Sequence, residues 1–151
     1  MNNFADQIEV RELRQACFHE AAHEVVVHAL GGRGDARVWR NDSPGAATGE
    51  EKAWRGQFRM WVSPEGPANW RTLVGLAGLV GESMADGRRD PNQIAGQIES
   101  SFELEEVSAT DFELIGELWT EAEVAQVADL LQGHWSDLER RVEEMKAFTE
   151  E

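Results

Sequence analysis

Apolar residues recur at helical spacing through the N-terminal part of the chain. Four of them are each four residues apart and fall on one side of a helix: Leu13, Cys17, Ala21 and Val25. The pattern stops at Gly31 and Gly32, a residue type that commonly follows the last turn of a helix. This spacing predicts a long first helix from about Asp6 to Leu30.

The segment from residue 33 to residue 67 loses the helical spacing and is rich in Gly, Pro and Asp. Within it, two short runs have the composition of β-strands, Ala36–Arg40 and Gln57–Val62. They predict a small β-ribbon whose exposed tip lies near Asp42–Glu51.

Helix signals return after the ribbon and continue to the end of the chain. A proline at the first helical position predicts a helix from Pro67 to Gly87 and another from Asp90 to about Glu105. A hydroxyl residue followed three positions later by an acid predicts two further helix starts, at Ser108 and Thr120. The charged tail, residues 134–151, is also predicted to be helical.

Length and element content predict one predominantly helical domain. At 151 residues the chain is long enough to bury a core and too short for two domains to be expected. We therefore expect an α+β fold with a small β-ribbon, in a single domain that covers residues 1–151. Gly75, Gly78 and Gly81 share one face of the second helix and would let it approach the first helix closely.

Charge and composition exclude several kinds of partner. The chain has 29 acidic and 14 basic residues, and its net charge of −15 repels phosphate backbones and anionic lipid headgroups. We therefore expect no nucleic-acid partner and no membrane partner. The longest apolar run, TLVGLAGLVG, is far shorter than the roughly 20 residues that cross a bilayer, and no secretory signal is visible. The single cysteine, Cys17, excludes an internal disulfide, so we expect a soluble cytoplasmic protein.

His19, Glu20 and His23 form an H-E-x-x-H motif inside the first predicted helix. At about 100° per residue, the two histidines lie about 40° apart and one turn apart, so both imidazoles can bind one ion. Glu20 projects beside them and is not placed to be a ligand. In zinc hydrolases with this motif, the metal lowers the pKa of a water molecule and polarises a carbonyl, while the glutamate takes the proton. The motif predicts a Zn²⁺ site with two histidine ligands and Glu20 as the general base.

A chance arrangement of polar residues is the alternative to a metal site. The motif lies between the apolar flanks ACF and VVV, however, and no cap or turn explains its histidines. His28 lies about 140° around the helix from His23, so we expect it to be a surface or packing residue. Cys17 points away from the side of His19 and is expected in the core.

A zinc site of this kind needs a third protein ligand, and the sequence offers two candidates. The first is Asp111, in the segment SATDFELIG. The second is Glu82, with Asp86 one turn later, a spacing similar to the ligand and supporting aspartate of neprilysin-type gluzincins. Asp111 could instead be only a member of a capping box, and Glu82 an exposed helix residue. Both candidates stay open at this point.

Several segments resemble the peptidase domain of FtsH-type ATP-dependent zinc proteases. FHEAAHEVVVHAL resembles that family's H-E-A-G-H-A helix, with Ala22 in place of the glycine, and DARVWRNDSPGAATG resembles the strand and loop that follow. LVGLAGLVGESMADG is similar to the helix with G-G-R-x-A-E, where Gly78 and Glu82 match and a leucine replaces the arginine. VSATDFELI resembles the G-A-S-N-D-L segment, and its aspartate aligns with Asp111. The resemblance covers roughly residues 11–116.

The resemblance implies an FtsH-type peptidase fold that binds one zinc ion through His19, His23 and Asp111, with Glu20 as the base. No G-x-x-x-x-G-K-[ST] phosphate loop is present. We therefore expect a metallopeptidase without its own ATPase that cleaves peptides or unfolded segments, either as a homo-oligomer or with a separate partner protein. The alternatives are a non-catalytic adaptor or regulatory protein that retains the peptidase fold, a neprilysin-like gluzincin, and a zinc amidase.

Overall fold

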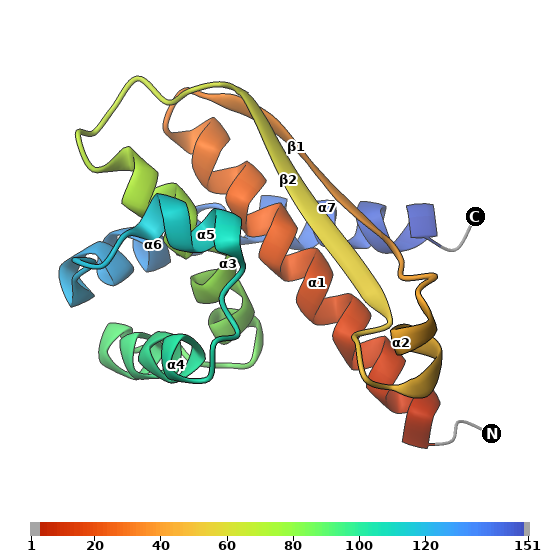
Figure 1. The fold of residues 1–151 in the computed structure, drawn as a ribbon. Helices are drawn as coiled ribbons and strands as arrows, with labels where there is room; N and C mark the ends of the chain where they lie inside the picture. The colour runs from red at the N-terminus through yellow and green to blue at the C-terminus, as the bar shows by residue number, and fades with distance from the viewer. Residues whose placement is uncertain (1–3, 150–151) are drawn as a thin grey trace.

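The computed structural model describes residues 4–149, which form helices and a small two-stranded sheet (Figure 1). The predicted architecture, predominantly helical with a small β-ribbon, is confirmed at this level. The predicted helical positions 150 and 151 lie outside the described residues. The elements in chain order are α1 (Phe4–Ala29), β1 (Arg33–Arg40), α2 (Pro44–Thr48), β2 (Trp54–Val62), α3 (Trp70–Ala85), α4 (Pro91–Glu103), α5 (Ala109–Ile115), α6 (Glu121–Gly133) and α7 (Trp135–Thr149).

Helix α1 is the element on which the others are assembled. Helices α3 and α7 and both strands pack against it, and the ribbon runs alongside it (Figure 1). Its apolar stripe is fully buried at Cys17, Ala21 and Val26. The predicted core position of Cys17 is thus confirmed, and burial raises the pKa of its thiol to about 11. Each helix within residues 4–149 is too short or too polar to span a lipid bilayer.

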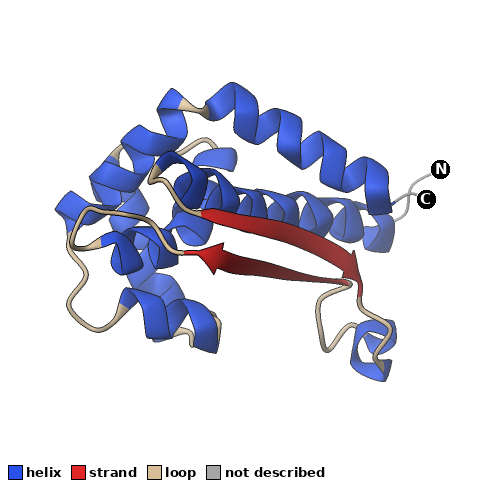
Figure 2. Ribbon diagram, turned by 90° about the horizontal axis from the view of Figure 1, so that it is seen from above, coloured by secondary structure: helices blue, strands red, loops and turns tan. Residues whose placement is uncertain are grey.

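The two strands pair antiparallel, with Ala36 opposite Phe58 (Figure 2). Each strand begins three residues earlier than predicted, because each contains a glycine near its start. Glycine weakens the sequence signal for a strand, but here it makes room for a neighbour. A side chain at Gly34 would collide with the Phe58 ring, and one at Gly56 would collide with Glu20 of α1. The inner face of the ribbon therefore lies close to α1.

The tip of the ribbon contains a short helix that was not predicted. The tip is exposed, as expected, but α2 forms within it (Figure 2). Ser43 caps α2 by accepting a hydrogen bond from the Ala46 N–H, Pro44 occupies the first turn, and Gly49 ends the helix at a φ of 83°. These are ordinary capping signals, but a helix of five residues is too short to show a helical spacing of apolar residues.

Helix α3 begins at Trp70, so the predicted start at Pro67 is wrong. Pro67 instead opens a turn, in which the Trp70 N–H donates a hydrogen bond to the Pro67 carbonyl oxygen, 3.0 Å away. The other predicted starts are confirmed. Ser108 accepts from the Asp111 N–H, 3.1 Å away, and Thr120 forms a complete capping box with Glu123.

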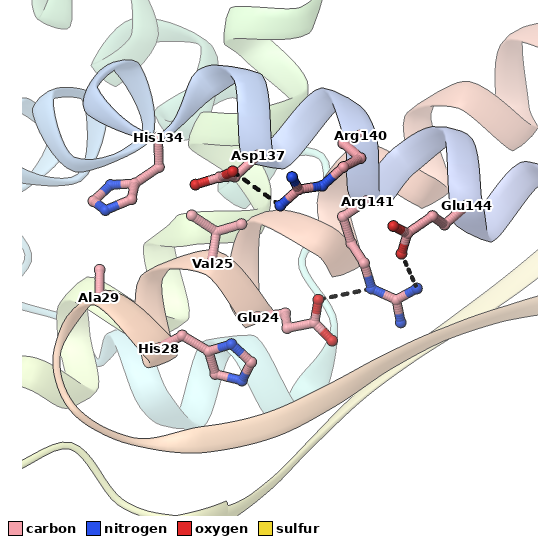
Figure 3. A pocket seen from close by; sticks show the side chains of 9 residues that line it. All are labelled: Glu24, Val25, His28, Ala29, His134, Asp137, Arg140, Arg141 and Glu144. Atoms are coloured by element: carbon pink, nitrogen blue, oxygen red, sulfur yellow. Dashed lines mark hydrogen bonds and ion pairs between the residues drawn. The ribbon is translucent and has the colours of Figure 1, made fainter.

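The outer edge of β1 is closed by side chains instead of a third strand. The Ala36 N–H donates to Glu24 Oε1 (3.2 Å), and Arg141 of α7 donates to the Ala36 carbonyl oxygen (3.0 Å). Arg141 Nε also lies 2.7 Å from Glu24 Oε2 beside a pocket of about 330 Å³ (Figure 3). This clamp joins α1, α7 and β1. Within residues 4–149, the outer edge of β2 has no pairing strand.

Replacing Arg141 with alanine would leave the buried Glu24 carboxylate without its cation and the Ala36 carbonyl without this donor. We expect the free energy of unfolding to fall by about 2 kcal/mol, the scale for losing hydrogen bonds to a charged group. Urea denaturation followed by circular dichroism measures the change. Arg140→Ala is the matched control, because Arg140 forms only an exposed pair with Asp137, worth about 0.5 kcal/mol. Equal losses in both variants would contradict the clamp.

Candidate metal centre

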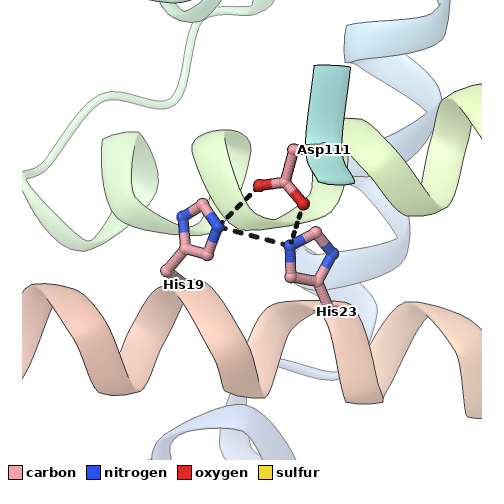
Figure 4. A group of neighbouring side chains, drawn as sticks. All are labelled: His19, His23 and Asp111. Atoms are coloured by element: carbon pink, nitrogen blue, oxygen red, sulfur yellow. Dashed lines mark hydrogen bonds and ion pairs between the residues drawn. The ribbon is translucent and has the colours of Figure 1, made fainter. Parts of the chain in front are cut away.

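Two segments far apart in the sequence bring three possible metal ligands together. His19 and His23 project from adjacent turns of α1, and Asp111 reaches them from the first turn of α5 (Figure 4). One donor atom from each residue lies within 4.8 Å of the others. The Asp111 N–H is bound by the Ser108 cap, which leaves its carboxylate free to face α1.

The donor atoms lie close to one another. His19 Nε2 is 3.3 Å from His23 Nε2 and 2.9 Å from Asp111 Oδ2, and His23 Nε2 is 3.3 Å from Asp111 Oδ1. Ligand atoms about 2.0–2.1 Å from one tetrahedral zinc ion are about 3.3–3.4 Å apart. The separation of the two Nε2 atoms therefore matches a shared ion. The two histidines contact different oxygens of Asp111, so binding of the ion through one of these oxygens requires a small shift of the carboxylate.

Hydrogen bonds at the outer nitrogens fix the orientation of both imidazoles. His23 Nδ1 lies 2.7 Å from the Val74 carbonyl oxygen, which only accepts, so His23 Nδ1 carries the proton. His19 Nδ1 lies 2.9 Å from Glu82 Oε2 and donates to that carboxylate in the same way. In the neutral form of each ring, Nε2 is left with a lone pair that faces Asp111. Metal-binding histidines usually have such a partner at the other nitrogen.

The electrostatic environment favours a positive charge between these groups. Burial opposes charge on His19, but Glu82 and Asp111 outweigh it and hold the pKa of His19 well above its ordinary value. Burial also opposes the charge of Asp111 and would raise its pKa, but the hydrogen bonds from His19 and His23 hold this pKa well below its usual range. A carboxylate and two lone pairs at these distances repel one another unless a proton or a metal ion lies between them. The residues therefore fit a divalent cation.

Glu20 borders the same cleft as the three possible ligands but is not part of the donor cluster. Burial raises the pKa of its carboxyl group, although the charges of His19 and His23 oppose the shift. Its side chain lies against Gly56 of β2, where a larger residue would displace it. The position suits a group that exchanges protons with a molecule in the cleft.

Packing from two sides restricts the histidine rings. Phe58 of β2 stacks on His23 with ring centroids 5.8 Å apart. The His19 ring lies against the backbone of α3 at Gly78, where any side chain would collide with it. Gly81 makes room for Ala22 of α1 in the same way. The predicted close approach of α3 to α1 is thus confirmed at these two glycines.

Gly75 does not serve that approach, so this part of the glycine prediction is wrong. A side chain at Gly75 would collide with Ile115 of α5. Residues three apart do not lie directly above one another on an α-helix, so the three glycines shift gradually around α3. Gly75, the first of them, therefore faces a different neighbour. That neighbour is the helix that carries Asp111, so Gly75 also contributes to the placement of the site.

A cleft of about 880 Å³ opens beside the donor atoms, a volume within the usual range for ligand-binding sites. Its walls come from the ribbon, the middle of α1 and the start of α5. Aromatic and apolar side chains line the ribbon side: Trp39, Trp54, Phe58 and Met60. The donor cluster is therefore open to a ligand.

The structure separates the two candidates for the third ligand. Asp111 faces the Nε2 atoms of both histidines, whereas Glu82 bonds the opposite side of the His19 ring. Asp86, the expected supporting aspartate of the second candidate, instead lies 3.6 Å from Arg88 at the surface. His28 is exposed and bonds the Gly34 backbone, as expected for a surface residue.

Sequence reasoning missed the Val74 carbonyl and the Phe58 ring. A backbone carbonyl that accepts from a histidine has no residue signature, because any residue can supply it. Phe58 was read only as a strand residue, since nothing in the sequence indicates that β2 crosses His23.

Compared with known proteins, the sequence matches no family model and no curated protein. The description of this site therefore depends on its own geometry.

Replacing Gly78 with alanine tests whether the packing of the His19 ring controls metal binding. The added methyl group would collide with the imidazole ring and force it out of its present position. We expect zinc affinity to fall on the order of tenfold or more, the scale of losing a supporting contact at a metal ligand. Competition with a chromophoric chelator measures it.

Gly96→Ala is the matched control, because Gly96 also lies within a helix but faces open space. Its affinity should equal that of the wild type. Unchanged affinity in a folded Gly78→Ala variant would show that the ring is not held as described.

Proposed function

We propose that the chain is a zinc-dependent metallopeptidase of the H-E-x-x-H type. The observation that carries the proposal is the convergence of His19, His23 and Asp111, with a hydrogen-bond partner at the outer nitrogen of each imidazole. In this proposal His19, His23 and Asp111 bind the ion, and Glu82 positions His19 from behind. A gluzincin arrangement is disfavoured, since Glu82 would have to leave its hydrogen bond to reach the same ion.

A catalytic metal is favoured over a structural one. Structural zinc ions usually have four protein ligands, whereas catalytic zinc ions have three and keep one position for water or substrate. Within residues 4–149 the donor cluster has three members, and all of them border the open cleft. This distinction supports an enzyme over a non-catalytic adaptor that retains the fold.

The chemistry divides between the ion and Glu20. A bound zinc ion would act as a Lewis acid that lowers the pKa of water and polarises a carbonyl group. Glu20 would accept the proton of the attacking water molecule and donate it to the leaving amine. Its position in the cleft, beside the donor cluster and outside it, suits this transfer.

The open edge of β2 supports a peptide as substrate. β1 is closed on its outer side by Glu24 and Arg141, whereas β2 has no neighbour on its outer side within residues 4–149. Residues of β2 also line the cleft. An extended peptide that pairs with a strand edge is a general mode of recognition, and it requires an unfolded substrate. We therefore propose cleavage of peptides or unfolded segments.

We further propose that the fold is that of FtsH-type peptidase domains. The segments with the resemblance supply His19, Glu82 and Asp111, which meet at one place although they lie far apart in the sequence. The free thiol of Cys17 is compatible with a reducing compartment such as the cytoplasm.

Replacing Glu20 with glutamine separates the enzyme from the adaptor. Glutamine keeps the size of the side chain and cannot accept the proton. We expect Glu20→Gln to bind zinc normally and to lose hydrolysis of an unfolded substrate such as casein by a factor on the order of 100 or more. Zinc titration and release of labelled peptides measure the two properties.

Glu113→Gln is the matched control, because Glu113 borders the same cleft and lies outside the donor cluster. It should retain activity. Zinc-loaded wild type without activity on a broad peptide library would overturn the catalytic proposal, and equal activity of wild type and Glu20→Gln would remove Glu20 as the base.

A further inference from the structure

The charge of the chain is unevenly distributed. Residues 33–62 contain six of the 14 basic residues and four of the 29 acidic residues, so this segment has a net charge of +2. The remainder of the chain has a net charge of −17. The β-ribbon is therefore a basic element on an acidic molecule.

Three of the six basic residues of the ribbon segment lie on the face that points away from α1, whereas Arg40 lies 3.5 Å from Glu9 of α1. Ala36 and its partner Phe58 face α1, so strand alternation places the following residues on this side: Asp35, Arg37, Trp39, Arg55 and Arg59. Trp61 follows at an irregularity of the ladder and is 66% exposed, and Trp39 is 43% exposed. No other described helix packs against the ribbon beyond α1 and α7. We call these residues the ribbon face: Arg37, Trp39, Arg55, Arg59 and Trp61.

The arginines of the ribbon face are available to a partner. Arg37 lies 3.6 Å from Asp35 and Arg55 lies 3.8 Å from Glu51, and all four side chains are largely exposed. Such exposed ion pairs contribute little to stability, so these arginines can form ion pairs with a partner instead. Within residues 4–149, Arg59 forms no ion pair.

A second surface, which we call the acidic groove, has the opposite character. It is a groove of about 670 Å³ between α4, α5 and the start of α6. Its apolar floor contains the aromatic cluster Phe102, Phe112 and Trp119, and the adjacent Leu118 is 91% exposed. The charged residues that line it are all acidic: Glu99, Glu103, Glu117 and Glu121.

We propose that the ribbon face of one copy of this chain docks into the acidic groove of a second copy. Each surface exposes large apolar residues, which usually marks an interaction site. One surface combines arginines with exposed tryptophans, and the other combines glutamates with an aromatic cluster. The two surfaces can therefore form ion pairs and apolar contacts with each other. A second copy supplies a partner for both surfaces, whereas other partners would require a separate molecule for each.

The contact is head-to-tail, because the two surfaces belong to different elements of the fold (Figure 1). Each copy would use its ribbon face on one neighbour and its acidic groove on another. Such heterologous contacts build rings when the rotation closes and filaments when it does not. The assembly would therefore exceed a dimer.

The contact would also lie beside the cleft. Trp39 and Arg55 belong to the ribbon face and also line the cleft. On the other side of the contact, Phe112 of the groove directly follows Asp111. The neighbour would thus form part of the cleft margin. The docking itself does not depend on the proposed peptidase activity.

Charge reversal on one surface at a time tests the docking. Arg37→Glu/Arg59→Glu blocks the ribbon face, and Glu103→Arg/Glu117→Arg blocks the acidic groove. In analytical ultracentrifugation at low ionic strength, wild type should show a mass above that of a dimer, and each variant should associate at least about tenfold more weakly. Salt at about 1 M, where the Debye length is about 3 Å, should weaken the wild-type association.

An equimolar mixture of the two variants gives the sharpest result. One variant keeps an intact groove and the other keeps an intact ribbon face, and their two reversed surfaces again carry opposite charges, so the mixture should regain assemblies larger than a dimer. Arg11→Glu/Arg140→Glu and Glu139→Arg/Glu143→Arg are the matched controls, since they change the net charge equally at exposed positions away from both surfaces. Both should associate like the wild type.

Three results would overturn the proposal. They are a wild type that stays monomeric, association that the two surface variants retain when each is alone, and a mixture of the two variants that stays monomeric. Circular dichroism of every variant excludes unfolding as the cause of a lost association.

Discussion

The hydrogen bonds at the outer nitrogens of His19 and His23 are the restraint on which the rest of the site depends. They turn both Nε2 lone pairs inward, toward each other and toward Asp111. Such an arrangement is repulsive by itself and becomes favourable only around a positive charge. The acceptors, Glu82 and the Val74 carbonyl, both belong to α3, so the packing of α3 against α1 determines how the imidazoles point. Ala22 lies within the motif, and it fits because Gly81 of α3 lies opposite it.

One edge of the ribbon is closed and the other is open, so only the open edge can pair with a substrate. Glu24 follows His23 on α1, and its carboxylate joins the outer edge of β1 to Arg141 of α7. The same helix thus presents possible metal ligands on one side and anchors the ribbon on another. The open edge of β2 then lies toward the donor cluster, with the basic outer face of the ribbon beside it. Substrate binding and self-association would accordingly use adjoining parts of one small sheet.

Local signals in the sequence predicted much of the fold. The apolar spacing of α1, the caps at Ser108 and Thr120 and the H-E-x-x-H motif are each contained within a few turns, and the structure has all of them where expected. Features that depend on distant contacts were less predictable. Which of Asp111 and Glu82 faces the Nε2 atoms depends on where α5 meets α1, a contact between residues 92 positions apart. The strand starts were also hard to predict, because each strand has a glycine near its start. These glycines make room for neighbouring side chains, Phe58 and Glu20, that lie far away in the sequence.

The position of a bound zinc ion tests the central claim most directly. Crystals grown with zinc, with diffraction data collected above and below the zinc absorption edge, would locate the ion without reference to activity. We expect one strong anomalous peak at about 2.0–2.2 Å from His19 Nε2, His23 Nε2 and an Asp111 oxygen. The absence of a peak at this position, or an ion bound by Glu82 instead of Asp111, would contradict the account.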